Sequence, residues 1–417
     1  MSTSWRLKSG FDRRFRGGHP WVYSNELSES PKGIAPGEEV TLHDAGGKFL
    51  AHGYGNPHSL IAFRVLSRDA EIQNPWSVEA LRARLVSARD LRLALGLGQV
   101  SYRLMHGEAD GIPGLVIDRY LLKTPDGRPA QAFVIQAHTA GVDRLLPRIL
   151  EALTPFVDEQ PTAIVLRNDL SVRKLEGIAE EEAKVQKALP GLDLSRVEIW
   201  VKSASGGEPL SFGVDLMGGQ KTGFFLDQAG NIELAISRLK SFGGKKRLRC
   251  LDLCTYVGQW GAQFSRAFSG LDVVAVDASE KALNAARENI ERAGGHCETL
   301  RGDVLRDLEA LPAQSFDVVI SDPPALIKNR KDLGAGTHAY LQLNTQAMRL
   351  LKRGGAIVSC SCSALLEEEA FLETLGKAAS RNRLDIRWVG RGTQAPDHPM
   401  RTEFPEGRYL KGWVGLT

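Results

Sequence analysis

The sequence predicts an α/β protein whose C-terminal half forms a doubly wound parallel sheet. Between Lys246 and Ser363, apolar runs typical of strands alternate with segments of helical periodicity, which favours right-handed strand–helix–strand units. Four of these runs end in residues capable of chemistry: a glycine-bearing loop after Asp252, Asp277, the Asp322-Pro323-Pro324 motif, and Cys360 with Cys362. Because ligands of open parallel sheets bind at the carboxyl ends of the strands, we expect these groups to face one crevice.

The composition is that of a globular protein of two or three domains. The chain has 417 residues, of which 42% are hydrophobic and 25% charged, and its net charge of +3 neither requires nor excludes a nucleic-acid partner. No apolar run approaches the roughly 18 residues of a membrane-spanning helix, and the opening MSTSWRLKSG lacks the apolar core of a signal peptide. We therefore expect a cytoplasmic protein with no membrane partner. The five cysteines include no CxxC pair, so we expect reduced thiols and no metal site.

Residues 1–75 predict a small β domain, because short strand-like runs are broken there by Gly, Asn, Pro and Ser. The opening is basic, with aromatic residues close behind: Arg6, Lys8, Arg13, Arg14 and Arg16, then Trp21 and Tyr23. Phosphate attraction combined with base stacking suits RNA, which makes Arg13, Arg14 and Trp21 candidate RNA-binding residues. A solvated arm in which Trp21 closes a small core explains the same residues equally well.

Residues 76–205 predict a mixed α/β segment. Apolar residues recur at helical spacing over 76–97, and 132–138 and 163–168 have the character of strands. The stretch HGEADGIPGLVIDRY, from His106, fits a Gly/Pro turn leading into a strand, although its His106, Glu108 and Asp110 also suit an active site. The acidic stretch 176–189 predicts a charged helix, and 203–211 predicts a linker.

Residues 206–417 hold the predicted parallel sheet. Helices are expected over 278–294 and 340–354, a further short strand over 296–303, and two closing strands over 385–390 and 408–417. Upstream, Lys221-Thr222-Gly223 resembles part of a P-loop, but the first glycine of that motif is missing. Backbone amides at the following helix start, near Gln228, could still bind an anionic group of a cofactor.

The glycine loop and two acids indicate the cofactor. The loop from Asp252 to Gly261 lacks the GxGxxG spacing of a dinucleotide site and suits a cofactor without a pyrophosphate. Asp277 ends the next strand, where an acid commonly bonds ribose hydroxyls, and Asp303 can accept from an adenine amino group. Together these features favour S-adenosylmethionine (SAM), although a single acid at a strand end is more often a helix cap.

Asp322-Pro323-Pro324 and the cysteines indicate the substrate. The prolines stiffen the chain beyond the strand and leave Asp322 to bond the edge of a base. A thiolate that adds to carbon 6 of a pyrimidine activates carbon 5 for methylation, so a cysteine beside the cofactor suits this chemistry. Buried cysteines are usually inert, and spacing alone does not select between Cys360 and Cys362.

These motifs together resemble the family of large-subunit rRNA cytosine-5 methyltransferases called methyltransferase I. The resemblance covers essentially the whole chain and is carried by HPWVYSNEL, YRLMHGEADGIPGLVIDRY, GGQKTGFFLDQ, DLCTYVGQWG, SDPPALIKN, SCSCS and DHPMRTEFPEGRYLKG. It implies a small β-barrel PUA domain over 1–75, a central α/β domain over 76–205, and a Rossmann-like class I methyltransferase domain over 206–417. Amino-group methylases on adenine or guanine usually carry an aromatic residue after Asp-Pro-Pro, where this chain has Ala325.

The resemblance also implies functional residues. It makes Cys362 the catalytic cysteine, with Cys360 an additional thiol, and places Asp322 at the target base. The residues implied at SAM are Gln228, Asp252, Tyr256, Gly258, Asp277, Asp303 and Asp322. Lys328, Arg330 and Lys331 would border the RNA, and the PUA resemblance favours the RNA-binding interpretation of Arg13, Arg14 and Trp21. A homodimer is also favoured.

The leading hypothesis is therefore a SAM-dependent enzyme that makes 5-methylcytosine in large-subunit rRNA through a covalent cysteine adduct. One alternative is an rRNA methyltransferase acting on an exocyclic amine such as guanine N2, which needs no thiol. A second alternative is a SAM-binding, RNA-binding protein without catalysis. The group that removes the proton from carbon 5 stays open, with Asp322 and a water molecule as candidates.

Overall fold

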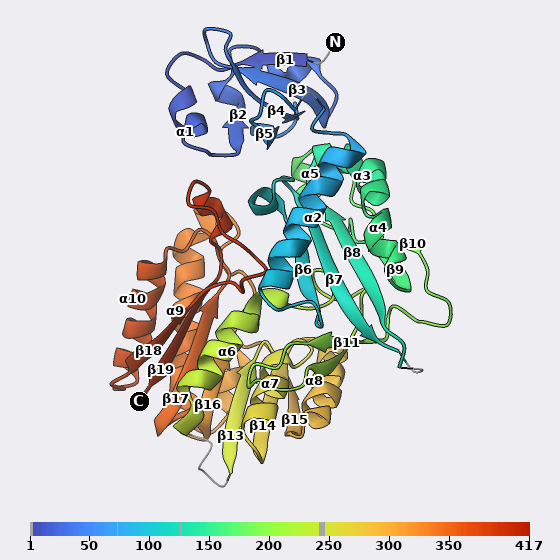
Figure 1. The fold of residues 1–417 in the computed structure, drawn as a ribbon. Helices are drawn as coiled ribbons and strands as arrows, with labels where there is room; N and C mark the ends of the chain where they lie inside the picture. Colours follow the sequence, from blue (N-terminus) through green and yellow to red (C-terminus); the bar gives the residue numbers. More distant parts are fainter. Residues whose placement is uncertain (1–2, 73, 125–126, 242–246) are drawn as a thin grey trace. The chain divides into compact units, whose positions relative to one another are not determined.

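The computed structural model describes residues 3–72, 74–124, 127–241 and 247–417, which form two compact units (Figure 1). The first unit holds the described residues up to Trp200 together with Asp215–Gly223 and Asp397–Gly407. The second unit holds Val201–Val214, Phe224–Pro396 and Arg408–Thr417. Two short segments of the C-terminal half thus belong to the first unit. Lys246, where the predicted sheet region begins, lies outside the described residues.

The N-terminal part of the first unit is a β-sheet of order β1-β3-β4-β5-β2, in which β1 and β3 are parallel and the other pairs antiparallel. Its elements are β1 (Thr3–Arg6), α1 (Asp12–Arg16), β2 (Trp21–Tyr23), β3 (Glu38–His43), β4 (Phe49–Gly55) and β5 (Ile61–Ser67). Trp5, Leu42 and Phe63 meet in its core. The small β domain predicted from the broken strand pattern is confirmed.

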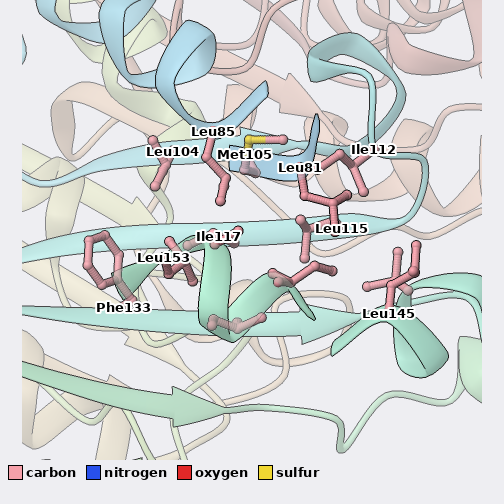
Figure 2. Packing of buried hydrophobic residues seen from close by; sticks show 14 of the residues in the cluster. Leu81, Leu85, Leu104, Met105, Ile112, Leu115, Ile117, Phe133, Leu145 and Leu153 are labelled. Atoms are coloured by element: carbon pink, nitrogen blue, oxygen red, sulfur yellow. The ribbon is translucent and has the colours of Figure 1, made fainter. Parts of the chain in front are cut away.

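The rest of the first unit is a second sheet covered by helices. Strands β10, β9, β8, β7 and β11 follow one another in it, and β6 also pairs with β7. The elements are α2 (Val78–Ala94), β6 (Tyr102–His106), β7 (Leu115–Lys123), β8 (Ala130–Ala137), α3 (Ala140–Ala152), α4 (Thr154–Asp158), β9 (Thr162–Leu166), α5 (Val172–Leu175), β10 (Lys184–Lys187) and β11 (Val197–Val201). Leu85 of α2 and Leu145 of α3 share one core with Ile117 of β7 (Figure 2).

The helix predicted over 176–189 is wrong. The acidic residues of this stretch instead pair with nearby cations, since Glu180 contacts Lys174 at 3.1 Å and Glu181 contacts Arg173 at 3.8 Å. The chain then runs as β10 along the edge of the sheet, antiparallel to β9. Backbone pairing with an exposed sheet edge has overridden the helical propensity of the charged residues, as tertiary context often does.

The second unit is built on a sheet of order β15-β14-β13-β16-β17-β19-β18. The first five strands in this order are parallel, as predicted, and the two closing strands are antiparallel additions. The strands are β13 (Leu248–Leu253), β14 (Leu271–Asp277), β15 (His296–Arg301), β16 (Phe316–Ser321), β17 (Leu351–Ser361), β18 (Arg387–Gly392) and β19 (Lys411–Leu416), with β12 (Leu210–Val214) outside this sheet. From β13 the chain builds outward to β15 and then returns to the other side of β13, which creates a topological switch point.

Helix α6 (Ala229–Arg238) precedes the sheet, and the helices between its strands are α7 (Gln259–Ala267), α8 (Glu280–Arg292), α9 (Leu333–Leu350) and α10 (Glu368–Arg381). The prediction placed α9 over 340–354, but it begins seven residues earlier and ends where β17 starts. Glycine explains the early start, because a Cβ on Gly336 would lie 2.3 Å from Ile327 Cγ1, so only glycine lets the first turns pack on the preceding loop. None of the helices in the described ranges combines the length and apolar character that a bilayer crossing requires.

Candidate functional site at the carboxyl edge of the second sheet

The carboxyl ends of β13, β14, β16 and β17 lie side by side at one edge of the sheet. Leu253 lies opposite both Val276 and Ser321, and Ser321 lies opposite Ser359. From these strands the chain continues into the glycine loop, Asp277, Asp322 and Cys362 in turn. The predicted juxtaposition of the four strand ends is confirmed, and β13 with its two neighbours places it at the switch point.

Asp322 is held by two side-chain donors. Its Oδ1 accepts from Gln228 Nε2 at 2.7 Å, and its Oδ2 accepts from Trp260 Nε1 at 2.9 Å. Asn231 Nδ2 in turn donates to Gln228 Oε1 at 2.7 Å, which orients the Gln228 amide. Gln228, at the end of the 3-10 helix η4 (Leu226–Gln228), is buried, whereas Asp322 is half-buried. The predicted pair Gln228 and Asp322 is therefore in direct contact, and sequence reasoning missed Trp260 and Asn231.

The glycine loop is a strained turn. Cys254, Tyr256 and Gly258 have φ angles of 61°, 49° and 77°. These angles lie in the left-handed region, which residues other than glycine, such as Cys254 and Tyr256, rarely adopt. The Thr255 amide donates to Val276 O at 3.0 Å, and the Tyr256 amide donates to Asp277 Oδ2 at 3.0 Å. The loop is thus tied to the end of β14, and such strain concentrates at functional sites.

Gly258 serves helix packing as well as loop conformation. A Cβ at this position would lie 2.9 Å from Ala286 Cα in α8. Gly258→Ala is expected to destabilise the fold by about 2–4 kcal/mol, since overpacking adds to the left-handed strain. Gly294→Ala is the matched control, because Gly294 has a φ of 94° but no atom within 4 Å of its added Cβ. Urea unfolding of both variants measures the difference, and equal losses would contradict the packing argument.

Asp252 stabilises the conformation of the glycine loop through hydrogen bonds. Its side chain is fully buried, and Oδ2 accepts from Thr255 Oγ1 at 2.6 Å and from the Gly261 amide at 3.2 Å. Its Oδ1 is buried and has no hydrogen-bond donor among the described residues. Because neither oxygen is accessible, this geometry disfavours the predicted direct contact of Asp252 with a cofactor and assigns it to loop support. Burial, with the nearby charges of Asp322 and Asp277, raises the pKa of Asp252 to about 7.

This shifted pKa predicts an unusual pH dependence of stability. The folded state keeps the Asp252 proton up to about pH 7, whereas the unfolded state loses it near pH 4, so this group makes stability fall as pH rises from 4 to 7. The free energy of unfolding should fall by at most about 4 kcal/mol over this range, because the Asp252 pKa differs by roughly three units between the folded and unfolded states. Asp252→Asn is expected to flatten the fall, measured by urea unfolding across this range.

Asp44 provides a control of opposite sign for that experiment. Hydrogen bonds from the Lys48 and Gly46 amides lower the pKa of Asp44, so its contribution is lost as pH falls toward the lowered value. Asp44→Asn should therefore leave the slope between pH 4 and 7 unchanged. A wild-type slope in Asp252→Asn would rule out Asp252 as the source.

Asp277 and Asp303 cap chain turns and still present carboxylate to solvent. Asp277 Oδ1 accepts from the Ser279 amide at 2.9 Å, and Asp303 Oδ1 accepts from the Leu305 amide at 2.9 Å. Asp277 is half-buried and Asp303 is exposed. Each acid thus bonds the amide two residues ahead and stabilises a turn, whereas the N-cap residue of α8 is Ser279 and not Asp277. A carboxylate accepts several hydrogen bonds, so each acid keeps acceptor sites for a ligand.

The four acids create a negative site. Burial raises the pKa of the Cys254 thiol, and the charges of Asp277, Asp322, Asp252 and Asp303 raise it further, so all four act on one loop residue. A cationic ligand is favoured there and an anionic one opposed.

The two adjacent cysteines differ in access. Cys360 lies in β17 with no exposed surface, and burial followed by the Asp322 charge raises the pKa of its thiol well above the usual range. Cys362 follows the strand, is half-buried, and its Sγ lies 3.8 Å from Pro323 O of the Asp-Pro-Pro motif. The structure therefore distinguishes two thiols that spacing could not, because Cys362 is partly accessible and Cys360 is buried.

Lys328, Arg330 and Lys331 lie exposed between the Asp-Pro-Pro motif and α9, the last two in the 3-10 helix η7 (Arg330–Asp332). This segment is anchored close to the cysteines, because the buried Ile327 donates its amide to Ser363 Oγ at 3.1 Å. The three cationic residues are thus exposed on a segment anchored beside the cysteines, and their contact with a substrate stays a prediction.

Arg13, Arg14 and Trp21 belong to the first unit. Arg13 is exposed, but Arg14 pairs with Glu26 at 3.1 Å. The Trp21 indole donates to Glu108 Oε1 at 2.8 Å, and its ring meets Phe404 edge-on at 4.7 Å. These contacts occupy Arg14 and Trp21 and favour the core-closing alternative for Trp21, whereas Arg13 is exposed.

The Lys221-Thr222-Gly223 segment also lies in the first unit. Thr222 is buried there and donates to Asp118 Oδ2 at 2.5 Å, and its hydroxyl lies 2.8 Å from the Tyr120 hydroxyl. These bonds disfavour Thr222 as a cofactor contact. Similarly, Glu108 and Asp110 bond Trp21 and Arg92, so the turn interpretation of this stretch holds: the 3-10 helix η3 (Gly107–Asp110) precedes β7.

Comparison with known proteins identifies both parts of the chain. The model of a PUA-like domain matches residues 6–68, and that of the methyltransferase small domain matches residues 227–384. Solved structures share the fold: SMU.776, a methyltransferase complexed with SAH, has a TM-score of 0.75, and a SAM-dependent methyltransferase from Streptococcus mutans has 0.74. Each is 16% identical and is matched over 100% of both chains. The predicted fold class is confirmed.

Relatives of known family are closer in sequence. Ribosomal RNA large subunit methyltransferase I of Salmonella arizonae is 34% identical over 416 residues, which cover 98% of this chain and 96% of the relative. The protein of the same name from Photobacterium profundum is 33% identical and covers 99% of both chains. The chain therefore belongs to the ribosomal RNA large subunit methyltransferase I family.

Proposed function

We propose that this protein methylates carbon 5 of a cytosine in large-subunit rRNA, with SAM as the methyl donor and Cys362 as the nucleophile. The observation that carries the proposal is the half-buried Cys362 thiol beside the Asp-Pro-Pro motif, at the same sheet edge as Asp277 and Asp322. The relatives' name supports rRNA as the substrate. The choice of carbon 5 rests on the thiol.

The residues of the site fit SAM. SAM carries a sulfonium and an ammonium against one carboxylate, and its net positive charge suits a site where Asp277, Asp322 and Asp303 add negative charge around Cys254. Asp277 and Asp303 would accept from its ribose and adenine, and Gln228 and Tyr256 would border it. When bound, SAM supplies an electrophilic methyl group. Gly258 and Asp252 would act indirectly, by shaping the loop.

The protein's own residues would then prepare the base. A cytosine flipped from its stack, at a cost of a few kcal/mol, would meet the carboxylate of Asp322, which Gln228 and Trp260 hold in place. The Cys362 thiolate forms a bond to carbon 6, and the ring electrons make carbon 5 nucleophilic. After methylation, loss of the carbon 5 proton to a base and of the thiolate from carbon 6 restores the aromatic ring and frees Cys362.

RNA contacts would come from several parts of the chain. The PUA-like domain, with Arg13 exposed, and the cations Lys328, Arg330 and Lys331 would meet phosphates, which position RNA without reading its sequence. Arg14 and Trp21, which were also predicted to bind RNA, would have to break their contacts with Glu26 and Glu108 to do so. We also propose the division into domains 1–75, 76–205 and 206–417, and a homodimer that sedimentation would test.

Nucleoside analysis tests the proposal. The protein, labelled SAM and large-subunit rRNA, both naked and within assembly intermediates, should yield labelled 5-methylcytidine. Labelled N2-methylguanosine would instead establish the exocyclic-amine alternative. RNA binding without methyl transfer to any of these substrates would support the non-catalytic alternative.

A further inference from the structure

Lys411 is a buried lysine beside the cysteine pair. It begins β19 and lies opposite Ser361 in the antiparallel pairing with β17. Its side chain is 7% exposed, and Nζ donates to Ser363 O at 2.9 Å and to Tyr409 O at 3.1 Å. Lysine is almost never buried without compensation, so a charge held next to Cys362 calls for an explanation.

The acids of the site oppose thiolates at its other cysteines. The Asp322 charge raises the pKa of the neighbouring Cys360 thiol, and Asp322 together with three further acids raises that of Cys254. A site that attracts a cationic methyl donor therefore disfavours the negative sulfur needed for attack on carbon 6. A cation close to the sulfur would allow the site both to bind the cationic methyl donor and to form the thiolate.

Lys411 is the cation that the described residues place there. Burial lowers the pKa of Lys411, and the charge of Cys362 opposes this lowering, so ammonium and thiolate stabilise each other. An ammonium has three donors, and the contacts described above use two of them on carbonyl oxygens. Among the described residues, Tyr340 and Cys360 also interact electrostatically with Cys362, Glu367 and Glu368 act on Lys411, and Asp322 acts on Cys360.

We propose that Lys411 stabilises the thiolate of Cys362 and is thereby a positioning residue for the reaction. The inference rests on the proposed function, in which Cys362 is the nucleophile. The Cys362 proton leaves to solvent, the electron pair stays on sulfur, and Lys411 keeps its own proton. The Ser363 and Tyr409 carbonyls hold the ammonium in position, since Ser363 directly follows Cys362 in the chain.

Thiol reactivity tests this inference without any methyl transfer. Iodoacetamide alkylation of Cys362 is followed by peptide mass spectrometry across pH 5–10, in a Cys360→Ala background that leaves one thiol in the peptide. Lys411→Met should lower the alkylation rate at pH 7 about tenfold, as for a pKa about one unit higher. Lys411→Gln should do the same, and Lys411→Arg should restore most of the rate.

Lys352→Met is the matched control, because Lys352 lies at the other end of β17 and pairs with Asp317 at 2.9 Å. It should leave the Cys362 profile unchanged. Thermal unfolding checks that each variant folds. If Lys411→Met does not fold, Lys411→Gln replaces it, because glutamine retains a hydrogen-bond donor for the Ser363 and Tyr409 carbonyls.

An unchanged Cys362 profile in the folded Met or Gln variant would overturn the inference. The alkylation experiment can fail or succeed independently of the methylation experiment that tests the proposed function. A wild-type protein that makes no 5-methylcytidine but shows the Lys411-dependent profile would retain the inference while the proposed function fails.

Discussion

Replacing Cys362 with alanine is expected to lower methyl transfer to rRNA by at least about a thousandfold, because the variant cannot form the bond to carbon 6 that activates carbon 5. The fold should be little affected, since Cys362 is half-buried and its contact with Pro323 O, at 3.8 Å, is weak. Single-turnover transfer of labelled methyl from SAM measures the effect, and calorimetric SAM binding should stay within a few-fold of wild type.

Cys360→Ala is the matched control for this prediction. The two thiols are two residues apart, but Cys360 is fully buried and its thiol pKa is raised well above the usual range, so it is expected to contribute packing and a hydrogen bond with Gln228 and not to act as the nucleophile. Its removal should cost about 1–2 kcal/mol of stability and leave most of the activity. Loss of activity in Cys360→Ala with retention in Cys362→Ala would move the nucleophile to the buried position. Full activity in Cys362→Ala would favour amine methylation.

Asp322→Asn is expected to lower turnover by about a hundredfold or more. Both carboxylate oxygens of Asp322 accept hydrogen bonds, from Gln228 and from Trp260, and an asparagine must turn its NH2 group toward one of these donors. The unsatisfied donor costs about 1–3 kcal/mol, and the site also loses the charge that would face the substrate. Steady-state kinetics with rRNA and calorimetry with SAM separate the loss of turnover from the loss of cofactor affinity.

Asp317→Asn controls for the same substitution at the other end of β16. Asp317 accepts from the Arg249 amide at 3.1 Å and from Lys352 Nζ at 2.9 Å, far along the strand from its carboxyl end. This variant should lose some stability and keep its turnover. Wild-type turnover in Asp322→Asn, or an equal loss in Asp317→Asn, would contradict the role proposed for Asp322.

The main features of the second unit could be predicted from local sequence. Buried parallel strands appear as apolar runs, and each run carried its functional residue at its end, so the four strand ends could be located before any pairing was known. The register confirms them through Leu253, Ser321 and Ser359. Local sequence could not tell which of Cys360 and Cys362 is the accessible thiol, because the exposure of each thiol depends on where β17 ends.

Long-range pairing explains what the sequence did not show. Trp260 and Lys411 are ordinary residues of a helix and a strand in the sequence, and they join the site only through the positions of α7 and β19. The 176–189 stretch was misassigned because an open sheet edge competes with helical propensity. Asp397–Gly407 joins the first unit through tertiary contacts such as that of Phe404 with Trp21, for which local sequence carries no signal.

Trapping the covalent adduct tests the central claim most directly. Large-subunit rRNA transcribed with 5-fluorocytidine presents a carbon 5 whose fluorine cannot leave as a proton does, so the bond from carbon 6 to the enzyme should persist after methylation. With SAM present, the wild-type protein should form a denaturation-resistant RNA adduct, and mass spectrometry should locate it at Cys362. An active protein that forms no adduct, or one attached to another residue, would contradict the account.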